Sequence, residues 1–184
     1  ATPFVRVEDA LETREFYMIK EAFNVASIKK NATITILRDI PNVTESLVYT
    51  TQNTTCTLDL NGHIVTGSCA NLLNINAPGS TFTITDNSEY KNGELRAMPS
   101  ANSRQVGYTI TAGTLKLEEG KMYATNAMER VSSSVNPNVR ITSIVVAAGA
   151  TFNMTGGVVE SVDEYNNYGI SINATSSTKG VMNM

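Results

Sequence analysis

The segment Thr55 to Gly67, TCTLDLNGHIVTG, contains the pattern that decides the fold. Leu58 and Leu60 alternate with polar residues, and a period of two is typical of a strand with one buried face. Asn61-Gly62 then offers the positive φ of a tight turn, and a second apolar run begins at Ile64. The segment therefore predicts a strand, a turn and a second strand.

The first of these strands has the pattern threonine, apolar, any residue, apolar, and this pattern returns along the chain. It occurs at Thr33-Ile34-Thr35-Ile36, Thr57-Leu58-Asp59-Leu60, Thr81-Phe82-Thr83-Ile84, Thr114-Leu115-Lys116-Leu117 and Thr151-Phe152-Asn153-Met154, with Val181-Met182-Asn183-Met184 as a sixth candidate. Successive copies start 24 to 37 residues apart. Repeats of about 20 to 50 residues indicate stacked structural units with loops of unequal length between them.

Two companion strands accompany most copies, one before and one after. The earlier companions are residues 47–51, 72–76, 108–111, 141–146 and 168–172, and the later ones are 63–66, 93–97, 121–124 and 158–161. Three short strands per repeat favour a single-stranded parallel β-helix of about five coils over a sandwich of hairpins. The sequence thus predicts an all-β fold.

Stacked coils bring equivalent strands about 4.8 Å apart, so that like side chains lie above one another. Two interior columns follow from the aligned copies. The first is Ile34, Leu58, Phe82, Leu115 and Phe152, and the second is Ile36, Leu60, Ile84, Leu117 and Met154. Because both columns are apolar throughout, we expect all ten side chains to be buried.

An amphipathic helix is predicted ahead of the repeats, over residues 13–30. Phe16, Ile19 and Phe23 follow the helical spacing of a buried face, and Thr13 is a suitable N-cap. We expect this helix to cover the first coil, since the end of a stack of strands leaves backbone groups and apolar side chains open.

The chain of 184 residues is expected to be one domain in two parts. Residues 1–31 form the N-terminal segment and capping helix, and residues 32–184 form the β-helix. Val181 to Met184 reads as the opening of another coil. We therefore expect either a longer solenoid or an end-to-end homo-oligomer that covers this coil.

Composition limits the partners and the location. Charged residues make up 17% of the chain and the net charge is −3, which disfavours nucleic acid as a partner. The sequence contains no apolar run long enough to span a membrane. It also has no basic segment followed by an apolar stretch, so any export signal is either already removed or absent from the given sequence. The start Ala1-Thr2-Pro3 suits either a mature protein or an artificially chosen start.

Cysteine and histidine give no metal-binding pattern. Cys56, Cys69 and His63 are too few for a zinc site, and no metal or other cofactor is predicted. Two buried free thiols or one disulfide are both compatible with the cysteines. His63 follows a turn and is expected to be a turn or surface residue.

The repeats resemble a known group of proteins. The helix, the segments Ala32 to Asp39 and Leu58 to Val65, and the glycine-initiated segment Gly149 to Gly157 are similar to right-handed parallel β-helix repeats of the pectate-lyase-like superfamily. More narrowly, they resemble secreted, adhesin-like bacterial surface proteins. The resemblance implies a non-catalytic surface module that binds glycans or cell-surface partners through loops. The alternative is a polysaccharide lyase or a glycoside hydrolase of the same superfamily.

If the chain is an enzyme, its acidic residues near the aligned strands are the candidates. They are Asp59, Asp86, Glu118 and Glu119, with Lys116 on the same outer face. Asp86 and Glu119 occupy equivalent positions in adjacent coils, and carboxyl groups about 5 Å apart are typical of retaining glycosidases. The alternative is that all five are ordinary solvated turn residues.

Aromatic residues are the candidates for binding sugar rings. They are Tyr90, Tyr123, Tyr165 and Tyr168. The two longest insertions, Asn87 to Val106 and Thr125 to Arg140, lie between coils, where loops on a rigid scaffold often carry binding determinants. Packing of each tyrosine against the coil is the alternative.

Overall fold

A computed structural model describes residues 2–101, 103–127, 140–162, 167–175 and 177–184. Within these residues the chain forms 16 strands and one helix, and the strands belong to two sheets. The predicted all-β class is confirmed.

The larger sheet has eleven strands. They are β1 (Val5–Glu8), β2 (Thr13–Phe16), β3 (Ala32–Ile36), β5 (Leu47–Tyr49), β6 (Thr55–Asp59), β8 (Leu73–Thr85), β10 (Arg104–Leu117), β12 (Arg140–Val146), β13 (Thr151–Met154), β15 (Asn167–Ile172) and β16 (Val181–Asn183). The long strands β8 and β10 each combine an earlier companion with an aligned copy of the repeat. All pairs in this sheet are parallel except those of β1 with β2 and β3.

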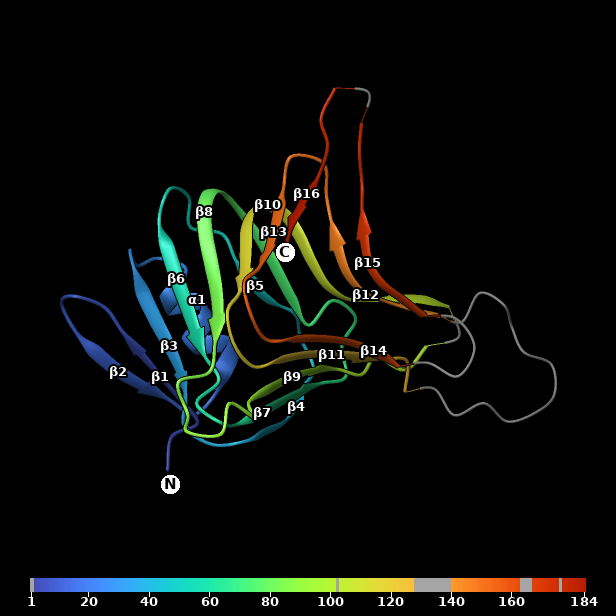
Figure 1. Ribbon diagram of the computed structural model, residues 1–184. Coiled ribbons are helices and arrows are strands. Elements are labelled where there is room, and N and C mark those ends of the chain that lie inside the picture. The colour runs from blue at the N-terminus through green and yellow to red at the C-terminus, as the bar shows by residue number, and fades with distance from the viewer. Residues whose placement is uncertain (1, 102, 128–139, 163–166, 176) are drawn as a thin grey trace.

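The second sheet has five strands, in the order β14-β11-β9-β7-β4. They are β4 (Ile40–Val43), β7 (Ile64–Gly67), β9 (Glu94–Ala97), β11 (Lys121–Thr125) and β14 (Val158–Val162), and every pair is parallel. Four of them are the predicted later companions, and β4 is an additional strand that follows the first copy of the repeat. Figure 1 shows this sheet at the bottom, with its strands running across the direction of the larger sheet. Each of the first five copies of the repeat is therefore followed by one strand of this sheet.

The register of the larger sheet confirms most of the pairings predicted within the two interior columns, with one correction. Thr33 pairs with Thr57, and Phe82 pairs with Leu115, as the alignment of repeats predicts. The predicted pairing of Leu58 with Phe82 is wrong, because Leu58 pairs with Ile84 and Cys56 pairs with Phe82. The slip is two residues, which is one full strand period, so each side chain keeps its predicted face.

The interior contains the predicted side chains. Nine of the ten are at most 1% exposed, and Met154, in the fifth copy of the repeat, is only partly buried against the core. A further column links Val65, Leu95 and Met122 on the smaller sheet. Because the apolar rows of the two sheets face one interior, the core is continuous.

The N-terminal helix is shorter than predicted. Helix α1 spans Ile19–Ala26, whereas Thr13–Phe16 forms strand β2 and pairs with β1. Met18 is the N-cap residue, so Thr13 does not cap the helix. Strand pairing prevails here because β1 covers the edge of β3 and β2 extends the same sheet. Phe16 is buried as predicted, but it belongs to strand β2 and not to the helix.

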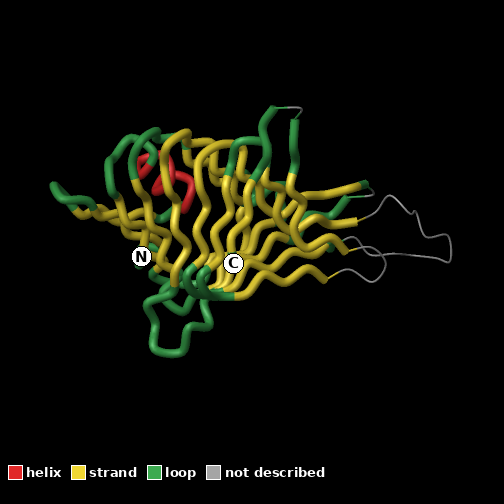
Figure 2. The backbone as a smooth tube through the Cα atoms, turned by 45° about the horizontal axis from the view of Figure 1, so that its top comes forward, coloured by secondary structure: helices red, strands yellow, loops and turns green. Residues whose placement is uncertain are grey.

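Helix α1 packs against β5, which is the first of the earlier companion strands. The first copy of the repeat has no earlier companion strand, and the helix takes that place. Lys20 Nζ donates to the Ser46 carbonyl at 2.8 Å, and Ser27 Oγ donates to the Val48 carbonyl at 3.3 Å. The rings of Phe23 and Phe82 stack with centroids 6.0 Å apart. Figure 2 shows the helix in red at one end of the strand array. The predicted covering of the first repeat by a helix is thus present in the structure.

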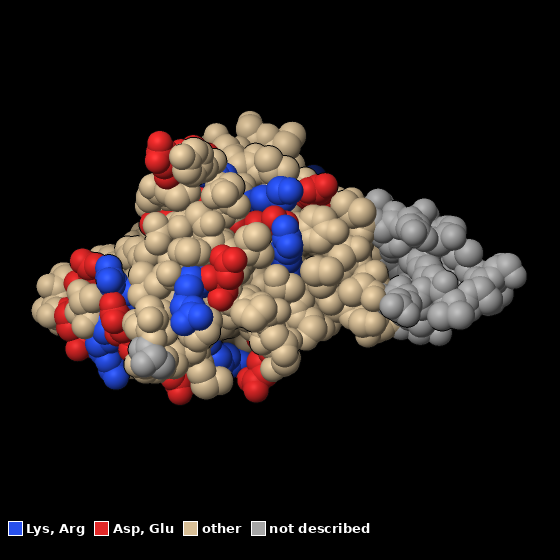
Figure 3. All heavy atoms as spheres, turned by 90° about the horizontal axis from the view of Figure 1, so that it is seen from below, with Lys and Arg blue, Asp and Glu red and all other residues tan. Residues whose placement is uncertain are grey.

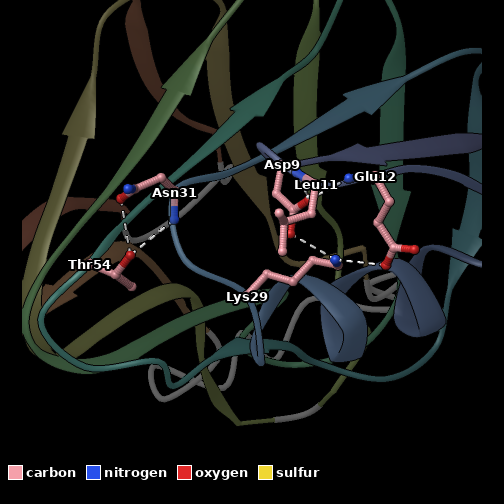
Figure 4. A network of polar contacts seen from close by, with 6 residues as sticks. All are labelled: Asp9, Leu11, Glu12, Lys29, Asn31 and Thr54. Atoms are coloured by element: carbon pink, nitrogen blue, oxygen red, sulfur yellow. Dashed lines mark hydrogen bonds and ion pairs between the residues drawn. The ribbon is translucent and has the colours of Figure 1, made fainter.

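Lys29 joins the end of the helix segment to the turn between β1 and β2 (Figure 4). Its Nζ lies 2.7 Å from Asp9 Oδ2 and 2.8 Å from Glu12 Oε1. Asp9 Oδ1 also accepts the N–H groups of Leu11 and Glu12, each at 2.9 Å. The Lys29 side-chain bond, followed by the backbone bonds, lowers the pKa of Asp9 from 3.8 to about 2.

The last repeat leaves apolar side chains accessible. Strand β16 pairs in parallel with β13, which confirms the sixth copy of the repeat. Val158, Ile172 and Val181 are 51%, 47% and 43% exposed. Covering of this repeat by further coils or by a second copy stays a prediction.

Candidate functional site

The outer face of the smaller sheet carries a ladder of polar side chains. Residues of β9 and β11 alternate between inward and outward positions, with Leu95 and Met122 buried. The outward positions align across the sheet, so that Arg96, Tyr123 and Glu160 lie in register on β9, β11 and β14. A row of hydrogen-bonding side chains therefore has an aromatic ring at its centre.

Glu94 and Arg96 form a bidentate ion pair in this ladder. Arg96 Nε lies 3.0 Å from Glu94 Oε1, and its NH2 group donates to Glu94 Oε2 at 3.0 Å. The Glu94 side chain is only 8% exposed. The bidentate contact raises the pKa of Arg96, with burial opposing it, and fixes the guanidinium plane on the sheet surface.

Lys121 and Glu160 form a second pair beside the ring. Lys121 Nζ lies 2.9 Å from Glu160 Oε2, and this hydrogen bond raises the pKa of the lysine. Tyr123 is half-buried between the two ion pairs in the register of the sheet. Its backbone carbonyl accepts the buried Tyr108 hydroxyl at 2.7 Å, which anchors the strand from below.

Asp39 and His63 extend the same surface. Asp39 Oδ1 accepts the Ile64 N–H at 3.0 Å and lies 3.1 Å from His63 Nδ1. The Ile64 bond, with smaller help from His63, lowers the pKa of Asp39 against the effect of burial. Viewed from below, Figure 3 shows cationic and anionic groups interspersed across this face. The surface is therefore polar and balanced in charge.

Asp59 and Asp86, two of the candidates for catalysis if the chain is an enzyme, are buried at strand ends. Asp59 Oδ1 accepts the N–H groups of Asn61 and Asn87 at 2.9 and 3.0 Å. Asp86 is 0% exposed and accepts three backbone N–H bonds. Burial would raise the pKa of Asp86, but its hydrogen bonds outweigh that effect and lower it. Both carboxylates thus act as hydrogen-bond acceptors for turns.

The other predicted catalytic residues are more accessible. Glu118 Oε1 accepts a hydrogen bond from Lys116 Nζ at 2.5 Å, and Glu119 is exposed. Asp86 and Glu119 follow the register pair Ile84 and Leu117, so their equivalence in adjacent repeats holds at the backbone. A catalytic role for Asp59, Asp86, Lys116, Glu118 and Glu119 applies only to the alternative in which the chain is an enzyme.

The predicted tyrosines differ in their surroundings. Tyr90 lies in the loop between β8 and β9 and is 78% exposed, whereas Tyr123 lies on a strand. Tyr165 and the side chain of Tyr168 lie outside the described residues, as does most of the predicted binding loop Thr125 to Arg140. A rigid position in the sheet distinguishes Tyr123.

Sequence reasoning missed Glu94, Arg96 and Glu160. These residues alternate with apolar ones on the later companion strands, so the alternation places them on one outer face. The signal is present in the sequence, because companion strands of successive repeats must pair as the aligned copies do.

Both cysteines are free thiols, so no disulfide forms between them. Cys56 is buried, which raises its thiol pKa to about 12, and Cys69 is half-buried. Among the described residues, no three His, Cys, Asp or Glu side chains converge in a metal-binding group. Nor does the described part of the chain contain a helix long and apolar enough to cross a membrane.

Comparisons with models of protein families, with curated proteins and with solved structures found no match to this chain.

Proposed function

We propose that the stacked parallel strands form a right-handed parallel β-helix and that the chain is an exported, non-catalytic surface module that binds glycans. The support for the β-helix is the order of pairing. Each of three strand classes pairs with the same class in the next repeat, and each class contributes one buried row. A continuous chain that returns to the same three positions is a coil.

The single observation that supports glycan binding is the position of Tyr123. Tyr123 is half-buried on β11, in register with Arg96 on β9 and Glu160 on β14. An aromatic face binds the apolar face of a sugar ring, and charged side chains fixed by ion pairs can bind its hydroxyls. We therefore propose a binding surface on the sheet, in place of the loops that the sequence favoured.

The charge balance indicates which glycans fit. Arg96 and Lys121 are each paired with a glutamate, so the surface has no excess of positive charge for an acidic polysaccharide. We therefore expect neutral glycans to bind, with little dependence on salt concentration.

The lyase or glycosidase alternative has weaker support. A retaining glycosidase needs one carboxylate free to attack and another free to exchange a proton. The oxygens of Asp59 and Asp86 accept hydrogen bonds from turn amides instead. An assay for sugar release from acidic and neutral polysaccharides tests this alternative, and the expected result is no release.

The binding test compares two tyrosine variants on a panel of neutral and acidic glycans. We expect Tyr123→Ala to weaken binding about tenfold or more, the effect of removing a central aromatic anchor of roughly 1–2 kcal/mol. Tyr90→Ala removes an equally large ring from an exposed loop and should leave binding unchanged. Equal losses in the two variants, or binding that only acidic glycans show, would contradict a site centred on Tyr123.

A further inference from the structure

Asp86 lies where two successive turns meet, at the end of β8. Its Oδ1 accepts the N–H groups of Gly62 and Ser88, each at 2.9 Å, and its Oδ2 accepts the N–H of Gly93 at 2.5 Å. The carboxylate therefore joins the turn after β6 to the loop between β8 and β9. Both of its oxygens face backbone amides.

All three donors share one chemical feature, because each follows an asparagine in the sequence. The dipeptides are Asn61-Gly62, Asn87-Ser88 and Asn92-Gly93, and the two Asn-Gly pairs are the only ones in the chain. Asparagine followed by a small residue, above all glycine, is the ordinary site of spontaneous deamidation.

Deamidation starts at the atom that Asp86 holds. The backbone nitrogen after the asparagine attacks the side-chain carbonyl carbon and forms a five-membered succinimide. The carbon–nitrogen bond of the side-chain amide breaks, and ammonia leaves with the proton lost from the backbone nitrogen. Water then opens the ring to aspartate or isoaspartate. The attacking nitrogen must therefore give up its hydrogen bond and turn toward the side chain.

The surroundings of the asparagines show why protection is needed. Asn92 and Asn87 are exposed, so water reaches both side chains. Asn61 and Gly62 both have positive φ, 49° and 77°, which is the conformation of a tight turn. A negative charge on an isoaspartate would also lie close to the buried Asp86 carboxylate and repel it. Damage at one turn would thus disturb the contact between two repeats.

We propose that Asp86 protects Asn61, Asn87 and Asn92 from deamidation by holding the backbone N–H that follows each of them. One carboxylate stabilises the nitrogens in their hydrogen-bonded geometry and keeps them from attack. Charge-assisted bonds of this kind are stronger than bonds between neutral groups, so the protection depends on the ionised side chain.

Asp59 provides a matched control. It is a buried aspartate at the equivalent end of β6, and it also accepts turn N–H groups. Its donors are Asn61 and Asn87 themselves, and none of its contacts involves Gly93. Loss of Asp59 should loosen a turn without releasing the nitrogen that follows Asn92.

The experiment follows deamidation of the folded protein by peptide mapping with mass spectrometry at neutral pH. It compares wild type with Asp86→Asn and Asp59→Asn, below the melting temperature of each. The amide of Asp86→Asn has one acceptor oxygen, so at least one of the two glycine nitrogens loses its partner. We expect deamidation at Asn61 or Asn92 to become roughly 10- to 100-fold faster, the factor that follows from losing a hydrogen bond to a charged group. Asp59→Asn should match wild type at Asn92.

Two results would overturn the proposal. One is an Asp86→Asn rate no higher than wild type at both glycine sites, and the other is a lower rate, which would make Asp86 a base that promotes the attack. If Asp86→Asn does not fold, the wild-type protein is compared in buffer and in urea. Protection requires slower deamidation at all three asparagines in the folded protein, and equal rates in both conditions would refute it.

Discussion

At the scale of single residues, the contacts between repeats depend on side chains that take the place of backbone hydrogen-bond partners. Asp86 does so for Gly62 and Gly93, and Asn61 donates through Nδ2 to the Ile36 carbonyl of the preceding repeat at 3.0 Å. The backbone of these turns does not pair with a neighbouring strand. Each buried N–H group in a turn therefore needs a side-chain oxygen as its acceptor. The turn residues are consequently as important to stacking as the apolar columns.

Gly93 is a position where a side chain has no space. A Cβ there would lie 2.5 Å from the Leu60 Cβ and 2.7 Å from Asp86 Oδ2. We expect Gly93→Ala to lower the free energy of unfolding by about 1–3 kcal/mol through overpacking, as measured by urea denaturation. Gly169→Ala is the control, because nothing lies within 4 Å of its added Cβ. Equal stability of the two variants would contradict the described contact.

Phe82 is a fully buried side chain between Cys56 and Leu115 in the register of the larger sheet. It contacts the rings of Phe23 and Tyr49, with centroid distances of 6.0 and 5.2 Å. We expect Phe82→Ala to cost roughly 3–5 kcal/mol, the sum of lost transfer free energy and a residual cavity. The exposed Leu11→Ala should change stability by at most about 0.5 kcal/mol. A small loss for Phe82→Ala would place that ring outside the core.

At the scale of elements, the N-terminal segment closes the first repeat with three pieces. Strand β1 pairs with β3, β2 extends that edge, and α1 packs on β5. The sequence predicted the buried faces of Ile19 and Phe23 correctly, since helical spacing is a local property. It could not show that Thr13–Phe16 is a strand, because that outcome depends on the free edge of β3, which only the folded sheet creates.

The Lys29 contact makes this closure sensitive to acid. The folded pKa of Asp9, about 2, lies below the ordinary 3.8, so its stabilisation is fully present above about pH 4 and is lost as the pH falls to about 2. We expect Lys29→Ala to lower the urea midpoint at pH 6 and to have a smaller effect at pH 2. Lys30→Ala, a neighbouring exposed lysine, is the control. A loss that is equal at both pH values would show that Asp9 is not involved.

At the scale of the whole molecule, the repeat in the sequence predicts the stacking of the chain. The alignment of threonine-led copies predicts both the parallel pairing and the buried columns, because a stacked structure must place like residues above one another. Its errors are the two-residue slip between β6 and β8 and the predicted full burial of Met154, which is only partly buried. The slip arises because the copies were aligned on threonine, and both Thr55 and Thr57 fit that pattern.

The candidate site was harder to predict than the fold. Tyr123 was chosen from its residue type, but its partners Arg96 and Glu160 come from other repeats and are 27 and 37 residues away. Only the register of the second sheet brings them together. The buried Asp86 shows the opposite case, in which a carboxylate that suggested catalysis has its oxygens occupied by turn amides.

Disulfide trapping tests the parallel stack most directly. The experiment introduces pairs of cysteines into a variant in which Cys56 and Cys69 are replaced. The structure pairs Thr57 with Thr83 in register. Their Cα atoms should lie about 4.8 Å apart, which a disulfide spans, whereas the diagonal partner Thr81 should lie roughly 8 Å from Thr57. The account predicts rapid oxidation of Thr57→Cys with Thr83→Cys and little oxidation of Thr57→Cys with Thr81→Cys. Preferred oxidation of the second pair would contradict the register of β6 on β8, and oxidation of neither pair would contradict the stack.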